Sequence, residues 1–312
     1  MYEQIAANKR KAAFYIGLFF VVWVGIGALV GALVAATSSP PPDNGPTGDV
    51  LTGALIAAVG AGFAILYAVT AGAHLVLAAS GAKPADPAQY AQLHNIVEAL
   101  AIGDGLPKPK VYVIEDPSPN AFATGISPNN AAITATTGLL EMMNREELEG
   151  VIGHEMSHIK NYDVRLILIV STLIGLAGLL ASMIWRSAAY SRPRGKNGGQ
   201  AMLILFAAGL LLGVIAFVVG PLIRFALSRD RESLADASAV ELTRNPAGLI
   251  SALRKLQGND QPFKKFNHAT AAMCIDDPLQ HHQSRLHHLF DTHPPLEERI
   301  AVLEKMASGQ SL

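Results

Sequence analysis

The stretch "NREELEGVIGHEMSHIKNYD" (residues 144–163) predicts the helix around which the polar part of this chain is built. Asn144 is a favourable N-cap, and Glu146 and Glu147 suit the positive end of the helix dipole. Apolar residues recur at helical spacing and predict a face directed to a core: Leu148, Val151, Ile152 and Ile159.

His154 and His158 lie four positions apart on this predicted helix. At ~100° per residue they are separated by about 400°, so both imidazoles project from one face and could share a metal ion. Glu155 stands about 100° away, where it suits a general base acting on a water at the metal. The alternative is an exposed helix with two solvated histidines, and the short motif alone does not exclude it.

A catalytic zinc takes three protein ligands and leaves a fourth position for water. Glu232 is the candidate third ligand, and Asp236, one helical turn further on, could accept the free N–H of a ligand histidine. The other interpretation of this segment is an exposed helix with ion pairs, since Arg229, Asp230 and Arg231 stand alongside.

The composition indicates a membrane protein with a sizeable polar part. Half of the 312 residues are hydrophobic and 16% are charged, whereas soluble domains carry about 25% charged residues. The net charge is −1, and positive and negative residues are evenly mixed along the chain, so nucleic acid is not an expected partner. The single cysteine, Cys274, cannot form an internal disulfide, so the polar part needs no oxidising compartment.

Four apolar runs are each long enough for a transmembrane helix, which takes about 20 residues. They comprise residues 12–36, 50–79, 166–185 and 201–223. The remaining sequence is predicted to form one polar domain in two parts, residues 80–165 and 224–312. Because two runs separate these parts, the two histidines and Glu232 would lie on the same side of the membrane.

Basic residues in the short flanks predict the orientation. Lys9, Arg10 and Lys11 precede the first run, and the loop at residues 37–49 has no basic residue, so the amino terminus and residues 80–165 are expected in the cytoplasm. The loop after the third run disagrees, since it places four basic residues on the outer side: Arg186, Arg192, Arg194 and Lys196. Either the first hairpin dominates, which we assume, or the second does not cross fully.

The first polar part also predicts a small sheet. Residues 87–106 have a helical pattern, and the alternating valines of "KPKVYVIED" (108–116) are typical of a half-buried strand. The segments "NAFATGI" (120–126) and "AAITATTGLLEMM" (131–143) are interpreted as short strands leading into a turn. The expected fold is therefore mainly α-helical with a small β-sheet.

Four segments, in this order, resemble the HtpX-like membrane zinc metalloproteases, which are related more distantly to the CAAX prenyl proteases. They are "NAFATG" (120–125), "TTGLLEMMNREELEGVIGHEMSHIKNYD" (136–163), "SRDRESLADASAVELT" (228–243) and "THPPLEERI" (292–300). The resemblance implies a zincin-like protease domain with one zinc ion on His154, His158 and Glu232. It also implies that Glu155 is the catalytic base and that Asp236 supports the ligands.

The same resemblance implies a place for substrate. Asn120, Ala121, Phe122 and Ala123 match an edge strand beside the active-site helix, where an extended peptide can pair through main-chain hydrogen bonds. His293, in "THPP", has two interpretations: it could donate to the oxyanion, or with its prolines simply fix the turn into the last helix. Four further histidines are interpreted as part of a solvated loop rather than a second metal site: His281, His282, His287 and His288.

The predicted function is that of a zinc endopeptidase at the cytoplasmic face of the inner membrane, with the lipid bilayer and membrane proteins as partners. Quality control of membrane proteins under stress is the role that the resemblance implies. One alternative is an intramembrane protease of the site-2 type, but that would place the motif inside a hydrophobic span. Another is a scaffold or transporter with structural histidines, which would not depend on zinc.

Overall fold

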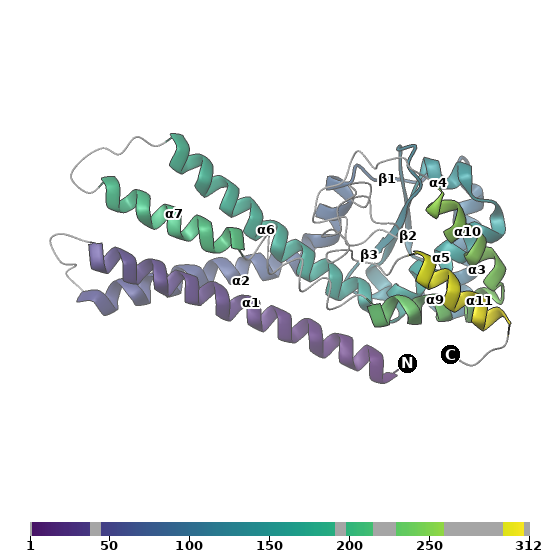
Figure 1. Ribbon diagram of the computed structural model, residues 1–312, viewed down its shortest axis with the longest axis horizontal. Coiled ribbons are helices and arrows are strands. Elements are labelled where there is room, and N and C mark those ends of the chain that lie inside the picture. The colour runs from purple at the N-terminus through teal and green to yellow at the C-terminus, as the bar shows by residue number, and fades with distance from the viewer. Residues whose placement is uncertain (1, 38–44, 191–197, 215–228, 259–295, 309–312) are drawn as a thin grey trace. The chain divides into compact units, whose positions relative to one another are not determined.

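The computed structural model describes residues 2–37, 45–190, 198–214, 229–258 and 296–308, which are mostly helical with one small sheet (Figure 1). The chain divides into two compact units. The first comprises Met1–Lys9, Ala71–Leu168 and Leu222–Leu312, and the second comprises Arg10–Thr70 and Ile169–Pro221.

Apolar helices make up the second unit. Among the described residues, three helices are long and apolar enough to cross a membrane: α1 (Tyr2–Thr37), α2 (Gly45–Ala79) and α6 (Asp163–Tyr190). Each begins before the apolar run that predicted it, because helical hydrogen bonding continues through polar flanks where the hydropathy pattern stops. A shorter apolar helix, α7 (Gly198–Val214), covers part of the fourth run, and residues 215–223 of that run lie outside the described residues.

A mixed four-stranded sheet lies in the first unit, with the strand order β1-β2-β4-β3. Its strands are β1 (Lys83–Pro84), β2 (Lys110–Ile114), β3 (Ala121–Thr124) and β4 (Ala132–Thr136). β2 and β4 are parallel, whereas β1 and β3 run antiparallel to their neighbours. β3 is therefore an edge strand of the sheet that the described residues form.

The strands confirm the three predicted strand segments, but the predicted turn after β4 is wrong. That segment forms the short helix α4 (Thr137–Met142), which begins because the Thr136 side chain accepts a hydrogen bond from the backbone N–H of Leu139. A short 3₁₀ helix at Pro128–Asn130 joins β3 to β4. The two-residue strand β1 was not predicted, since so short a segment carries no periodicity.

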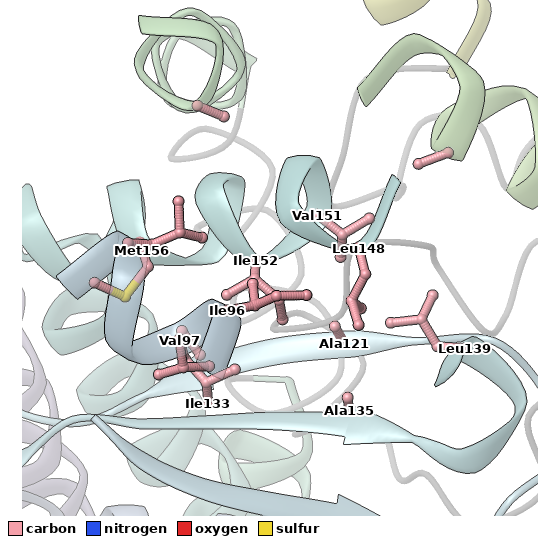
Figure 2. Close-up of a cluster of buried hydrophobic side chains, with 14 of the residues drawn as sticks. Ile96, Val97, Ala121, Ile133, Ala135, Leu139, Leu148, Val151, Ile152 and Met156 are labelled. Atoms are coloured by element: carbon pink, nitrogen blue, oxygen red, sulfur yellow. The ribbon is translucent and has the colours of Figure 1, made fainter. Parts of the chain in front are cut away.

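The core of the first unit lies between the sheet and two helices, α3 (Ala91–Asp104) and α5 (Arg145–Lys160). Both confirm predicted helices, although α3 begins four residues later than its pattern suggested. Figure 2 shows the apolar side chains that meet between these helices and the strands: Ile96, Val97, Ala121, Ile133, Ala135, Leu139, Leu148, Val151, Ile152 and Met156. One face of α5 is thereby fixed on the sheet.

Two further helices pack against α5: α9 (Arg229–Thr243) and α10 (Pro246–Gln257). The helix α11 (Leu296–Ala307) packs against α10 and α9. α11 confirms the predicted last helix. α10 was not predicted, although its start has a recognisable signal: Asn245 accepts a hydrogen bond from the backbone N–H of Gly248, and Pro246 occupies the first turn.

Candidate metal centre

The helix that carries both histidines begins with a capping box. Asn144 Oδ1 accepts a hydrogen bond from the backbone N–H of Glu147 at 2.9 Å, and Glu147 Oε2 accepts one from the backbone N–H of Asn144 at 2.8 Å. Glu147 also accepts hydrogen bonds from Ser251 and Lys255 of α10, at 2.7 and 2.6 Å. The amino end of α5 is thus held both locally and by a distant helix.

Glycines on α5 let two other helices approach closely. A Cβ at Gly150 would lie 2.9 Å from the Cα of Leu249, on α10. A Cβ at Gly153 would lie 3.2 Å from Cγ2 of Thr243, on α9. Gly153 directly precedes His154, so the absence of a side chain there allows α9 to pack beside the histidine face of α5.

This packing brings His154, His158 and Glu232 together. The Nε2 atoms of the two histidines lie 3.2 Å apart. Glu232 Oε2 lies 3.3 Å from His154 Nε2, and Glu232 Oε1 lies 3.5 Å from His158 Nε2. All three side chains are buried, although Glu232 is distant in sequence from the histidines.

The spacing of these atoms fits a zinc ion. A tetrahedral zinc with ligand bonds of about 2.0–2.1 Å holds its ligand atoms about 3.3–3.4 Å apart. The two histidine nitrogens, 3.2 Å apart, lie close to that value, and each lies 3.3 or 3.5 Å from a different oxygen of Glu232. One ligand atom from each of the three residues lies within 4.8 Å of the other two. Two imidazoles and one carboxylate, with room in the coordination shell for water, are also the donor set of a known class of catalytic zinc sites.

The other ring nitrogen of each histidine faces a carboxylate. His154 Nδ1 lies 2.8 Å from Asp236 Oδ1, and His158 Nδ1 lies 3.2 Å from Asp163 Oδ2. Each carboxylate accepts a hydrogen bond from Nδ1–H, which favours the tautomer in which Nε2 has a free lone pair. Both histidines therefore offer Nε2 to the same point.

Arg299, on α11, binds the carboxylate that contacts His154. Its Nε and Nη2 atoms donate to the two oxygens of Asp236 at 2.9 and 2.7 Å, and its Nη1 lies 3.8 Å from Glu232 Oε2. This bidentate pair holds Asp236 in the orientation that meets His154. Arg299 Nη2 also approaches His154 Nδ1 to 3.3 Å, but two donors cannot bond each other, so that contact is only a close approach.

The buried charges around the site leave an excess of negative charge. Four buried carboxylates surround it: Glu155, Asp163, Glu232 and Asp236. In the part of the chain that the structure describes, two buried guanidinium groups oppose them, those of Arg231 and Arg299. With both histidines neutral, the state in which they can bind a metal, these described groups leave two negative charges, which a divalent cation would cancel.

The same charges shift the pKa values of the ligand shell. Burial and Arg299 lower the pKa of His154, but the hydrogen bonds with Asp236 and Glu232 outweigh them and raise it to about 9. Burial raises the pKa of Asp236, but Arg299 and His154 outweigh burial and lower it to about 2. Asp236 is therefore a permanent acceptor at neutral pH.

The candidate base and the candidate substrate strand lie beside this cluster. Glu155 is buried on α5 directly after His154. β3, which contains Ala121, Phe122 and Ala123, packs against α5 at the edge of the sheet, and Asn120 directly precedes it. These four residues are also buried, at 1–4% exposure.

Sequence reasoning missed two members of the site. Arg299 stands in the segment "THPPLEERI", and Asp163 ends the segment "KNYD". Both segments carry the family resemblance, but no local pattern relates either residue to a histidine. Only the folded chain shows those contacts. His293 and the four histidines of the predicted loop, residues 281, 282, 287 and 288, lie outside the described residues.

Residues 87–307 match the family model described as Peptidase family M48. The chain belongs to peptidase family M48. This assignment makes it a metalloprotease, for which zinc is the typical metal, and excludes the scaffold or transporter with structural histidines. The matched residues include α5, α9 and α11, the three helices that supply the cluster.

Relatives named "Protease HtpX homolog" are similar over almost the whole M48 chain. Those of Lactobacillus helveticus and of Listeria monocytogenes serotype 4a are each 42% identical, and that of Streptococcus gordonii is 41% identical. Each alignment covers 98% of this chain and 100% of the relative. The crystal structure of S. mikatae Ste24p is 20% identical with a TM-score of 0.48, covering 97% of this chain and 66% of that one, a likeness too distant to bear on function.

Proposed function

We propose that His154, His158 and Glu232 hold one zinc ion, and that Glu155 is the catalytic base of a membrane-anchored endopeptidase. The observation that carries this proposal is that the two histidine Nε2 atoms, 3.2 Å apart, each meet one oxygen of the buried Glu232 carboxylate, at 3.3 and 3.5 Å. Two imidazoles and a carboxylate are a donor set of catalytic zinc sites. The substrates are peptide bonds of membrane proteins or of proteins close to the membrane surface.

When bound, zinc acidifies a water molecule and polarises the scissile carbonyl. Glu155 would act as the base, taking a proton from the water that attacks the scissile carbonyl and passing it to the leaving amine. Asp236 and Asp163 keep the Nδ1 protons of the two histidines in place, so that neither ring can rotate its free lone pair away from the metal. Arg299 offsets the charge of Asp236 and Glu232 in the buried site.

Substrate would bind along β3 by strand addition. The residues Asn120, Ala121, Phe122 and Ala123 would offer backbone groups to an extended peptide, a mode of binding that does not demand particular side chains. Because these residues and Glu155 are buried, a peptide can reach them only after the surrounding chain has moved. Opening of the site is therefore a step of the proposed cycle.

We place the active site at the cytoplasmic face of the inner membrane. The helix α5 lies outside the three candidate membrane spans, which favours a site at the membrane surface over one inside a span. The basic residues Lys9, Arg10 and Lys11 before the first apolar run support the cytoplasmic side. Four complete membrane crossings and a role in quality control of membrane proteins belong to the same proposal and rest on the apolar runs and the family resemblance.

The experiment that tests this function compares Glu155→Gln with the unchanged full-length protein in detergent. Zinc content should stay at one ion per chain, while the rate of casein cleavage should fall by about 10²–10⁴-fold, the contribution of a general base. Glu149→Gln, a change of the same type on the same helix, is the matched control and should cleave normally. Unimpaired cleavage by Glu155→Gln would remove Glu155 from this role.

A further inference from the structure

The start of the first apolar helix contacts the metal centre through a chain of hydrogen bonds. Asn8, on α1, is 3% exposed. Its side-chain amide donates to the backbone carbonyl oxygen of Asn161 at 2.9 Å and to Asp163 Oδ1 at 2.7 Å. The other oxygen of Asp163, Oδ2, accepts from His158 Nδ1 at 3.2 Å. Asn8 is thus two hydrogen bonds away from a candidate zinc ligand.

These contacts use the full donor capacity of the Asn8 side chain. An amide NH₂ has two hydrogens, and each has one buried acceptor here. The hydrogen bond from Asn8 to Oδ1 restrains the rotation of the Asp163 carboxylate, whose second oxygen meets His158 Nδ1 at 3.2 Å. Without Asn8, the nearest described cation to Asp163 Oδ1 is Arg231, at 3.9 Å, which is too long for a hydrogen bond.

Lys9, the residue after Asn8, contacts the same connection between α5 and α6 through Tyr162. Tyr162 has φ +61°, a backbone conformation that is unfavourable for a bulky side chain. Lys9 Nζ lies 4.4 Å from the centre of the Tyr162 ring, within the range of a cation–π interaction. Asn8 and Lys9 therefore hold three consecutive residues, 161–163, which connect the end of α5 to the start of α6. Residues Met1–Lys9 accordingly belong to the compact unit that contains the cluster.

We propose that Asn8 is a positioning residue of the metal centre, which orients Asp163 and through it the imidazole of His158. The first apolar helix is then a structural part of the zinc site as well as an anchor. This inference rests on the proposed function, because it takes His158 to be a zinc ligand. It identifies a residue outside the segment that matches the family model, which begins at residue 87.

The test measures zinc affinity of the full-length protein in detergent by competition with a chromogenic zinc chelator. Asn8→Ala should weaken zinc binding by about 10-fold, the lower end of the effect of outer-shell partners. Cleavage of a peptide substrate should show a lower kcat with an unchanged KM. Arg10→Gln, an exposed position on the same helix, is the matched control and should bind zinc like the unchanged protein. Asn8→Ser, which keeps one donor, should lie between them and serves if Asn8→Ala does not fold.

A double-mutant cycle separates positioning from a general effect on folding. If Asn8 acts through Asp163, then Asn8→Ala should cause no further loss of zinc affinity in the Asp163→Ala background. An equal further loss there, or unchanged zinc affinity in folded Asn8→Ala and Asn8→Ser, would overturn the inference and leave the proposed function intact. An unchanged protein that neither binds zinc nor cleaves would instead overturn the proposed function, and the inference with it.

Discussion

The two sides of the metal centre are built in different ways. On the α5 side, His154 and His158 share one helical face, and Asp163 supports His158 from five residues away. On the side of α9 and α11, Glu232, Asp236 and Arg299 come from distant sequence, and Arg299 is 145 residues from His154. The shared face of the two histidines follows from helical geometry, whereas the second side exists only because α9 packs against α5 and α11 packs against α9. Substitutions can therefore remove the contacts of one side while leaving those of the other in place.

The largest effect is expected from the loss of the distant ligand. Glu232→Ala removes one of three proposed zinc ligands, so zinc affinity should fall by more than the roughly 100-fold that the loss of an outer-shell partner can cause. Elemental analysis of the purified protein after dialysis measures this. Glu241→Ala, on the same helix, is the control and should retain zinc. Full zinc occupancy in Glu232→Ala would show that the α9 side supplies no ligand.

A smaller difference is expected between the two supporting aspartates. Asp236→Ala and Asp163→Ala should each weaken zinc binding by about 10–100-fold. Asp236→Ala should be the more severe, because it also leaves the buried guanidinium of Arg299 without its bidentate partner. Competition with a zinc chelator measures the zinc affinity of both variants. A greater loss of zinc affinity in Asp163→Ala would show that the α5 side depends more on its supporting aspartate than the α9 side does.

The smallest effect concerns the amino end of α5. Burial raises the pKa of Glu147, but hydrogen bonds from Lys255, Ser251 and the backbone N–H of Asn144 outweigh it and lower the pKa below its ordinary value of 4.5. The ionised form therefore stabilises the fold above about pH 4.5, and this contribution is lost as the pH falls through the folded-state pKa. Glu147→Gln should cost about 1 kcal/mol at pH 7.

Thermal unfolding at pH 7 and at pH 4 checks this prediction. The melting temperature of Glu147→Gln should fall less on acidification than that of the unchanged protein, since the variant has no carboxylate to protonate there. Zinc affinity at pH 7 should remain unchanged, because Glu147 stabilises the helix without contacting the cluster. An equal loss of stability in both proteins on acidification would contradict the assigned role of Glu147.

Much of the fold could be predicted because its signals are local. The capping residue Asn144, the periodicity of α5 and the apolar runs of α1, α2 and α6 each depend on neighbours in sequence. The elements that were not predicted depend on a single capping side chain or on pairing with a strand that is distant in sequence. α4 begins at the cap made by Thr136, and β1 exists only by pairing with β2.

By itself, the sequence determined which residues could form half of the metal centre, because a spacing of four on a helix places His154 and His158 on one face. It also made Glu232 and Asp236 candidates through their own spacing of four. Only the tertiary structure decided which partners meet. Asp236 with Arg299 supports His154, and Asp163 with Asn8 supports His158. Contacts between residues so far apart are set by how helices pack, and no local pattern encodes them.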